Sequence, residues 1–302
     1  MAAALAAPLA TRDSAVTIET LEPDDVAALR LPGYRAARTL RSALERYPGR
    51  SVWSPMTLEY AQVGSWRNRS EIANVDELVA VRNAEPLLRA AFERCVMHGD
   101  ELLIAIELES QRAPSRFERA GLEPLEEVIT YDTTIAQRRW TPRTPIRLVP
   151  VVAGDYRAID TIARLDAMAF PWLWRNSRAE FDIYLDIPGV EVSLVELAGE
   201  PVGYVGITHF AGWGHLDRIA VAPETQGRGL GRDALELAVE AMRRRGSRRV
   251  ALSTQRTNRR SQRLYERFGF RRTYDHDYRL FGRWRDPDGV IARETRANEA
   301  HG

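Results

Sequence analysis

The 302-residue sequence contains no lysine, so all 43 of its basic residues are arginines. This absence excludes mechanisms that need a lysine Schiff base or the lysine of a phosphate-binding P-loop. The single cysteine, Cys95, excludes a disulfide within one chain and a cysteine-type metal site. We expect Cys95 to be a small core residue on a helix, and we place the protein in the reducing environment of the cytoplasm.

Long apolar runs are also missing from the sequence. No run approaches the roughly 18 residues that a membrane-spanning helix needs, so we expect no membrane partner. A hydrophobic content of 44% with 28% charged residues is typical of a globular protein, and the length suffices for two domains. Residues 1–14 are rich in alanine, and we expect them and residues 285–302 to be flexible tails.

Charge of one sign does not dominate, because the formal net charge is only +1. The composition therefore does not point to a polyanionic partner for the whole chain. Arginines nevertheless gather around a glycine-rich stretch in the second half, at positions 228, 232, 243–245, 256, 259, 260 and 263. Such a local cluster favours a small, heavily phosphorylated ligand.

The polar, proline-containing segment Arg138–Pro145 separates two halves and is the candidate linker. In the second half, the hydrophobic periodicity predicts a strand, two helices, three strands, and then helix, strand, helix and strand. The expected strands are residues 146–151, 191–197, 201–210, 215–222, 248–254 and 270–281, and the expected helices are residues 153–168, 177–185, 230–245 and 258–269.

The two halves resemble each other, which indicates two copies of one fold. The segment Ser115–Asp132 matches Gln262–Leu280. In the first copy 17 residues separate a central strand from Gly99, whereas 24 separate the matching strand from Gly246 in the second copy. The missing piece is the glycine-rich stretch, so we expect only the second copy to keep a working ligand site.

That stretch, APETQGRGLGRDALE at Ala222–Glu236, places three glycines at the head of an apolar-periodic helix. Free backbone N–H groups and the positive end of the helix dipole make such a turn an anion site. A nucleoside triphosphate would need a lysine in the loop, and a dinucleotide would need GxGxxG spacing and a later acid. Neither pattern is present, which leaves the pyrophosphate of coenzyme A as the favoured ligand.

Two motifs resemble those of the GCN5-related N-acetyltransferase (GNAT) superfamily. Gln226, Gly229 and Gly231 match its acetyl-CoA signature Q/R-x-x-G-x-G/A, and NRRSQRLYERFGF resembles its second signature, with Ser261 where alanine is usual. The resemblance implies an α/β fold with a V-shaped, splayed mixed sheet flanked by helices, in two tandem acyl-CoA N-acyltransferase domains. Residues 144–284 would be the catalytic domain, and residues 15–140 a degenerate copy without the pyrophosphate loop.

The resemblance also implies where acetyl-CoA, the acyl donor, would bind. Pantetheine would extend the strand that ends at Val221, the pyrophosphate would meet the loop amides, and Asn258 would reach the pantetheine arm. The implied binding residues are Ile219, Ala220, Val221, Gln226, Gly227, Arg228, Gly229, Leu230, Gly231, Arg232, Asn258 and Tyr265. The family uses no metal, and the five histidines show no metal-ligand spacing.

Acetyl transfer to an amine needs a base for the amine, a donor to the thioester oxyanion and a proton for the leaving thiolate. By family position, Ile219 N–H is the oxyanion donor and Tyr265 the acid, each with an ordinary packing role as the alternative. Strand alternation predicts that His215, Asp217, Ile219 and Val221 share one face. We therefore expect His215 to be the base and Asp217 to orient it or hold a water. The alternatives are a half-buried histidine and, for Asp217, a contact to the substrate ammonium or a surface charge.

The acceptor site is expected in the aromatic segment AFPWLWRNSRAEF, with Phe170, Trp172 and Trp174 as its walls, although core packing between helices explains these rings equally well. The expected activity is acetyl transfer to a primary amine of a small molecule or a protein N-terminus, by direct attack in a ternary complex. A non-catalytic acyl-CoA sensor is the alternative, and a nucleic-acid-binding protein is disfavoured. The acyl-chain length and a homodimer are left open.

Overall fold

The structure is a computed structural model that describes residues 16–31, 33–109, 116–135 and 142–288. The expected tail 1–14, the end of the expected tail 285–302 and residues 138–141 of the linker lie outside these ranges. The described chain forms two lobes that share one mixed twelve-stranded sheet. Within the described ranges, none of the helices is both long and apolar enough to cross a membrane.

The second half follows the order that its periodicity predicts. Its elements are β7 (Ile146–Val151), α4 (Tyr156–Ala169), η4 (Trp172–Trp174), α5 (Arg178–Leu185), β8 (Val190–Leu197), β9 (Glu200–Phe210), β10 (Trp213–Val221), η5 (Pro223–Thr225), α6 (Leu230–Arg244), β11 (Arg249–Gln255), α7 (Arg259–Phe268) and β12 (Arg271–Trp284). Local signals set the helix ends: Asp155, Ser177 and Asn258 accept a backbone N–H as N-caps of α4, α5 and α7. Gly269, at φ 110°, ends α7.

The first half has related elements in a smaller lobe. They are β1 (Glu19–Thr20), η1 (Pro23–Ala28), α1 (Tyr34–Arg46), β2 (Val52–Ser54), β3 (Glu59–Ser65), η2 (Trp66–Asn68), β4 (Ile72–Val79), α2 (Ala84–Met97), β5 (Leu102–Leu108), α3 (Arg116–Arg119) and β6 (Glu123–Thr134). Only four residues lie between β4 and helix α2, in contrast to the longer glycine-containing connection before α6. Cys95 is buried in α2, which confirms its predicted place on a helix in the core.

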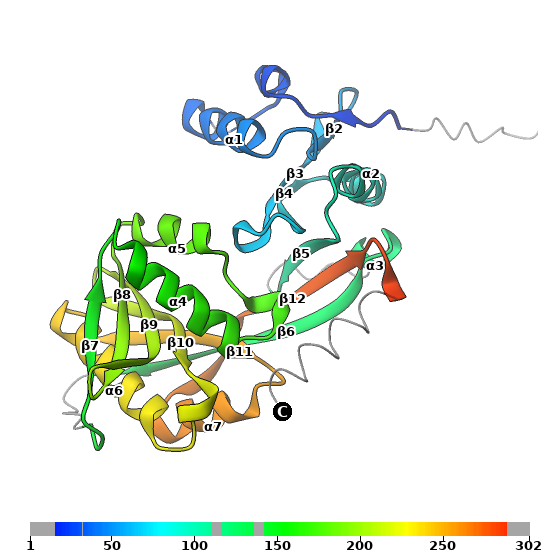
Figure 1. Ribbon diagram of the computed structural model, residues 1–302. Helices are drawn as coiled ribbons and strands as arrows, with labels where there is room; N and C mark the ends of the chain where they lie inside the picture. The colour runs from blue at the N-terminus through cyan, green and yellow to red at the C-terminus, as the bar shows by residue number, and fades with distance from the viewer. Residues whose placement is uncertain (1–15, 32, 110–115, 136–141, 289–302) are drawn as a thin grey trace, which may run out of the picture.

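The sheet does not divide at the linker, because the last strand of each half crosses into the other lobe. The strand order is β1-β2-β3-β4-β5-β12-β6-β11-β10-β9-β8-β7. Strand β6, from the first half, pairs antiparallel with β11 of the second, and β12 pairs antiparallel with β5 of the first. In Figure 1 these two long strands bridge the lobes side by side. The predicted boundaries, residues 15–140 and 144–284, therefore separate the two halves of the sequence. They do not separate the lobes, because the sheet of each lobe contains a strand from the other half.

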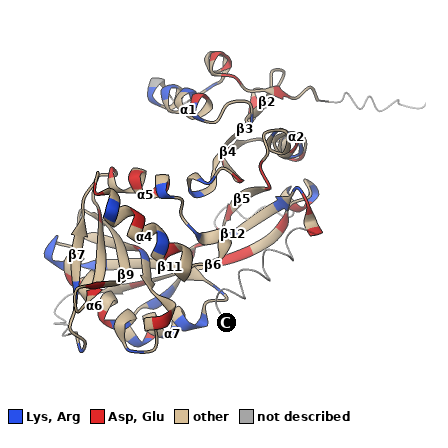
Figure 2. Ribbon diagram, viewed as in Figure 1, with Lys and Arg blue, Asp and Glu red and all other residues tan. Residues whose placement is uncertain are grey.

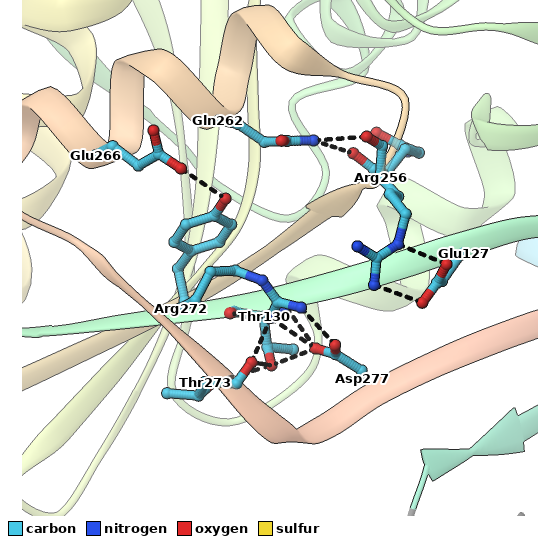
Figure 3. A network of polar contacts seen from close by, with 10 residues as sticks. Glu127, Thr130, Arg256, Gln262, Glu266, Arg272, Thr273 and Asp277 are labelled. Atoms are coloured by element: carbon cyan, nitrogen blue, oxygen red, sulfur yellow. Dashed lines mark hydrogen bonds and ion pairs between the residues drawn. The ribbon is translucent and has the colours of Figure 1, made fainter.

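Polar contacts anchor the exchanged strand β6 in the second lobe (Figure 3). The Arg272 guanidinium pairs with Asp277 at 2.6 Å, and Asp277 Oδ1 accepts the backbone N–H of Thr130 on β6 at 2.9 Å. Arg256, just after β11, forms an ion pair with Glu127 on β6 at 2.5 Å. Because β6 is fixed to β11 in this way, side chains of the first half reach the interior of the second lobe.

Each lobe opens where its two parallel strands part. Pairing between β10 and β11 ends at Leu216 opposite Leu252, although both strands run on to Val221 and Gln255. Helices α6 and α7 cover one face of this splayed sheet, and α4 and α5 cover the other. In the smaller lobe, the parallel pair β4 and β5 parts in the same way beyond Val75. This splayed mixed sheet is the predicted fold class.

Candidate active site

A cavity of about 1110 Å³ occupies the split between β10 and β11. Its lining includes the free half of β10, the glycine turn, one side of α7 along its length and the end of β11. Three further lining residues come from the first half of the chain: Arg67 on η2, and Glu126 and Val128 on β6. Since Phe170 and Trp174 on the α4 side also line it, the cavity has walls from both faces of the sheet.

The free edge of β10 presents backbone N–H groups to this split. Ala222 donates its N–H to Val202 of β9 at 2.8 Å. Successive N–H groups along a strand point to opposite sides, so those of Ile219 and Val221 point away from β9 and into the split. Both residues line the cavity, as does Ala220. This edge can receive an extended, amide-containing ligand as an added strand.

The glycine turn closes one end of the cavity. Gly227 and Gly229 have φ values of 82° and 85°, a left-handed backbone that favours glycine, and an added Cβ at either would meet open space. The first helical bonds of the turn, from the N–H groups of Arg232 and Asp233 to the Gly229 carbonyl, leave the preceding N–H groups available to an anion. The glycine turn therefore has the backbone geometry that the expected anion site requires.

Other predicted loop residues support the turn by different means. The Gln226 amide donates to the Val221 carbonyl at 2.8 Å and accepts from Arg260, which braces the loop. Arg232 pairs with the buried Glu236. Arg228 and Leu230 are not among the lining residues: the Arg228 side chain is exposed, and Leu230 is packed in the core.

Part of the predicted arginine cluster lies at this end of the cavity. Helix α7 carries Arg260, Arg263 and Arg267 along the lining, and Figure 2 shows the basic segments of α7. The inclusion of residues 243–245 in the cluster was wrong, because they lie at the far end of the fifteen-residue helix α6. There they pair with Glu240 and Glu191. The glycine turn and α7 together favour a phosphorylated ligand.

Tyr265 on α7 is almost completely buried and lines the cavity. Burial raises the pKa of its hydroxyl to about 12, with the Ser261 hydroxyl acting in the opposite direction. The ring contacts Tyr131 of the exchanged strand β6 at a centroid distance of 6.3 Å. Asn258, which also lines the cavity, caps α7 through a hydrogen bond from Ser261 N to its Oδ1 (3.1 Å). A neutral phenol is therefore held in the lining of the cavity.

The predicted shared face of His215 and Asp217 with Ile219 and Val221 is wrong. Leu216 pairs with Ile207 of β9, but Arg218 pairs with the next residue, Gly206, so Asp217 is the extra residue of a β-bulge. The bulge reverses the alternation: His215 and Asp217 face α5, whereas Ile219 packs against the core beneath α6. Strand periodicity could not reveal this change of phase.

The His215–Asp217 pair is engaged with its own neighbours. The Asp217 carboxylate accepts hydrogen bonds from the Tyr184 hydroxyl and from Thr208 Oγ1, the latter at 2.6 Å. It also contacts His215 Nδ1 at 2.6 Å. Burial, followed by the charge of Asp217, raises the pKa of Tyr184. His215 is not among the cavity-lining residues. These bonds connect β9, β10 and α5 and disfavour His215 as the base, whereas Asp217 itself lies in the cavity lining.

Glu126, which the sequence analysis did not single out, is a carboxylate in the cavity lining. Burial raises its pKa, although the hydroxyl of Thr257 at 3.3 Å, the Glu127 backbone and the indole N–H of Trp174 act in the opposite direction. A carboxylate with a raised pKa beside a cavity is a candidate base. No local signal could have found it, since Glu126 belongs to the other half of the sequence and arrives through the strand exchange.

The three aromatic residues predicted to line the acceptor site differ in what they contact. Trp174 lines the cavity and packs edge-on against Trp66 of the first half at 5.6 Å, and Phe170 lies beneath the Arg218 guanidinium at 3.9 Å. Trp172 does not line the cavity and stacks on Trp284 at 5.5 Å. The rings therefore serve chiefly as the packed interface of the two halves, and Phe170 and Trp174 also line the cavity.

A buried ionic network supports the bulged segment of β10. Asp166 of α4 is fully buried and accepts from the Arg218 guanidinium, the Tyr204 hydroxyl and the backbone N–H of Asn176. We predict that Asp166→Ala lowers the free energy of unfolding by about 3–5 kcal/mol, because it leaves the buried Arg218 charge without its partner. Urea unfolding measures this loss.

The matched control for this stability prediction is Asp160→Ala on the same helix. Asp160 is mostly exposed and pairs with Arg178 on the surface at 2.6 Å, so its loss is expected to change stability by less than about 1 kcal/mol. Equal effects of the two substitutions would show that the buried network is not what holds this segment.

Among the described residues, no group of three or more histidine, cysteine, aspartate or glutamate side chains lies together as metal ligands would. The features that the site does offer are a splayed sheet with a free strand edge, an anion-binding glycine turn and a buried phenol. Together they define the class of acyl-CoA-dependent acyltransferase folds.

Comparison with known proteins agrees with this class. Residues 159–270 match the acetyltransferase (GNAT) family. A curated protein of Bacillus subtilis (strain 168), provisionally named a ribosomal protein bS18-alanine N-acetyltransferase, is 29% identical over 111 residues, which is 37% of this chain and 73% of that protein. The chain contains a GNAT-family acetyltransferase domain.

Solved structures share the fold of nearly the whole chain. A GCN5-related N-acetyltransferase from Sphaerobacter thermophilus matches with a TM-score of 0.60 at 21% identity, over 90% of this chain and 96% of that one. A tandem GNAT protein from the clavulanic acid biosynthesis pathway matches with a TM-score of 0.56 at 16% identity, over 90% of this chain and 99% of that one. At these identities the likeness concerns the fold.

Proposed function

We propose that the protein is an acetyl-CoA-dependent N-acetyltransferase that acetylates a primary amine by direct attack in a ternary complex. The observation that carries this proposal is that three features line one cavity. They are the free edge of β10, the glycine turn and Tyr265. Acetyl-CoA supplies the acetyl group as a thioester. The open space at Gly227 and Gly229 fits the close approach of a pyrophosphate to the backbone.

Each catalytic requirement has a residue in the cavity lining. The N–H of Ile219 stabilises the negative charge that develops on the thioester oxygen. Glu126 accepts the proton that the amine loses when its nitrogen forms the new C–N bond. Tyr265 donates its phenolic proton to the sulfur as the C–S bond breaks, and the proton balance is restored by solvent. The raised pKa values of both side chains suit these roles, because Glu126 can hold a proton and Tyr265 keeps one until it is needed.

In this proposal, the first half of the chain is a related copy that does not bind acetyl-CoA. Its helix α2 begins at Ala84 without a glycine turn, and Phe117 stands where the second half has Tyr265. Phe117 stacks on Phe281 of the exchanged strand at 5.2 Å, as Tyr265 contacts Tyr131. A copy that transfers no acetyl group does not need the hydroxyl that Phe117 lacks. The first half instead supplies walls to the active cavity.

Calorimetric titration of acetyl-CoA tests the cofactor site. We expect the wild type to bind one equivalent per chain and Gly229→Glu to bind at least tenfold more weakly, since the new carboxylate repels the pyrophosphate. Gly154→Glu is the matched control: Gly154 has nearly the same φ, 86°, and equally open surroundings, but lies outside the cavity lining. Two equivalents would overturn the account of the first half, and no binding would overturn the enzymatic proposal.

The acceptor is then sought with a panel of amines that includes free amino acids, amino sugars and peptides with free N-termini. The named activity of the Bacillus subtilis relative makes an N-terminal alanine one member of this panel. The second candidate function, a non-catalytic acyl-CoA sensor, predicts acetyl-CoA binding with no transfer to any amine. Buried, protonated Tyr265 in the lining favours the enzyme over the sensor.

A further inference from the structure

Arg67 of η2 places a guanidinium from the first half in the lining of the active cavity. The turn that carries it is docked on the second half: Trp66 Nε1 donates to the Leu173 carbonyl at 2.7 Å, and Ser177 N–H donates to the Arg67 carbonyl at 3.3 Å. Figure 1 shows this segment of the first lobe facing α4 and α5. Arg67 thus belongs to the acceptor side of the cavity, away from the arginines of α7.

The Arg67 charge has no carboxylate partner among the described ion pairs. Its Nη1 donates to the neutral amide oxygen of Asn176 at 2.7 Å, and its Nε is buried without a hydrogen-bond partner. Asp166 and Glu180 are the carboxylates whose charges act most on Arg67. Asp166 already accepts a hydrogen bond from Arg218, and Glu180 accepts one from Asn68. An unpaired cation in such surroundings is costly unless an anion joins it.

The surroundings keep this cation in place and keep water away from it. The guanidinium lies 5.0 Å from the ring of Trp66 and 5.1 Å from that of Trp174. Burial, followed by the charge of Arg218, lowers the pKa of Arg67 to about 10, so the group is still charged at neutral pH. Most of the residue is buried, and the cavity is lined by the part that stays accessible.

The backbone of the turn is strained in order to hold this position. Arg67 and Asn68 have φ values of 55° and 51°, left-handed conformations that are uncommon for residues other than glycine. Strain of this kind costs of order 1–3 kcal/mol per residue and persists where the surroundings enforce it, often beside a ligand. The strained turn thus fixes the guanidinium at the cavity wall, and its unpaired charge and unpartnered Nε point to a bound anion.

We propose that Arg67 binds the carboxylate of the acceptor, so that the acceptor is an amino-acid-type amine rather than a neutral alkylamine. Arg67 lies over the ring of Trp174, and both residues line the same cavity as Glu126, so one ligand in this cavity can meet both charges. The carboxylate meets the Arg67 cation while the amine meets the Glu126 carboxylate. This inference rests on the proposed acetyltransferase function and adds the substrate class to it.

The test compares each of the twenty common L-amino acids with its amino alcohol, which lacks the carboxylate but keeps an amine of similar basicity. We expect kcat/KM of the wild type to favour the best amino acid over its alcohol by about 10- to 100-fold, the effect of a hydrogen bond to a charged group. In Arg67→Met this ratio falls toward one, chiefly through KM, and in Arg67→Lys it lies between. A wild type without the preference, or an unchanged ratio in Arg67→Met, overturns the proposal.

The matched control is Arg69→Met on the same turn. Arg69 pairs with Glu71 and donates to the Trp172 carbonyl, but it does not line the cavity. Its loss is expected to lower the unfolding temperature and leave the amino-acid preference intact. A ratio that falls equally in both variants would mean that the docked turn, and not the Arg67 charge, sets the preference.

Calorimetry separates failure of this inference from failure of the proposed function. Each of the twenty amino acids is titrated into the protein saturated with coenzyme A. Binding that is lost in Arg67→Met supports the carboxylate site even if no acetyl transfer occurs, in which case the enzymatic proposal alone fails. Absence of binding by all of the amino acids, together with transfer to neutral amines or to peptides, overturns the carboxylate site and leaves the acetyltransferase function standing.

Discussion

Glu126→Gln is expected to lower kcat for acetyl transfer by about 10²- to 10⁴-fold, the usual contribution of a positioned general base. Glutamine keeps the size and polarity of the side chain but cannot accept the amine proton. Acetyl-CoA affinity should not change, because the glycine turn and the free edge of β10 are formed by other residues. Stopped assays of acetylated product at saturating acetyl-CoA measure the loss.

The pH profile gives the same prediction a second readout. Burial raises the pKa of Glu126, so the ionised form that can act as a base is lost as pH falls through this raised value. The rate of the wild type should therefore decline on the acid side, at a higher pH than an exposed glutamate would cause. In Glu126→Gln the residual rate should not show this decline on the acid side.

Two variants serve as controls for Glu126. Glu127→Gln changes the next residue on β6, whose carboxylate pairs with Arg256 outside the cavity lining, and should keep most of the activity. His215→Ala removes the base that strand alternation suggested. This variant should also keep most of the activity, since the bulge puts His215 on the strand face opposite to Ile219. A large loss in His215→Ala with a normal Glu126→Gln would reverse the assignment.

Tyr265→Phe is expected to lower kcat by about 10²-fold or more while leaving acetyl-CoA affinity and folding nearly unchanged. The hydroxyl is the only group removed, and its pKa of about 12 keeps it protonated throughout the working pH range. The proton for the departing sulfur must then come from solvent. Kinetics with acetyl-CoA, together with calorimetric binding, separate the loss of rate from a loss of affinity.

The control for Tyr265 is Tyr131→Phe. Tyr131 is the neighbouring ring on β6, but its hydroxyl donates to Glu266 at 3.2 Å and it does not line the cavity. Its loss should affect stability more than rate. If both variants turned over at the wild-type rate, solvent would be a sufficient acid and Tyr265 would be a packing residue only.

Many features of the active lobe could be predicted from short stretches of sequence. Helix α6 begins after Gly229 and ends before Gly246, and α7 is bounded by Asn258 and Gly269, because caps and left-handed glycines act through neighbouring backbone groups. The glycine turn and Tyr265 follow from the same local rules. Their meeting in one cavity was implied by the family resemblance, and the described structure brings them together.

The sequence alone determined the order of elements in the second half, the conformation of the glycine turn and the place of Tyr265 on α7, since each depends on contacts within a few residues. Only the tertiary structure decided that a bulge at Asp217 turns His215 away, and that strand exchange brings Glu126 into the lining of the same cavity as Arg67. The reason is physical: any strand can satisfy the backbone hydrogen bonds of an open sheet edge. Which strand does so is settled by packing across the whole molecule, and local periodicity carries no record of that choice.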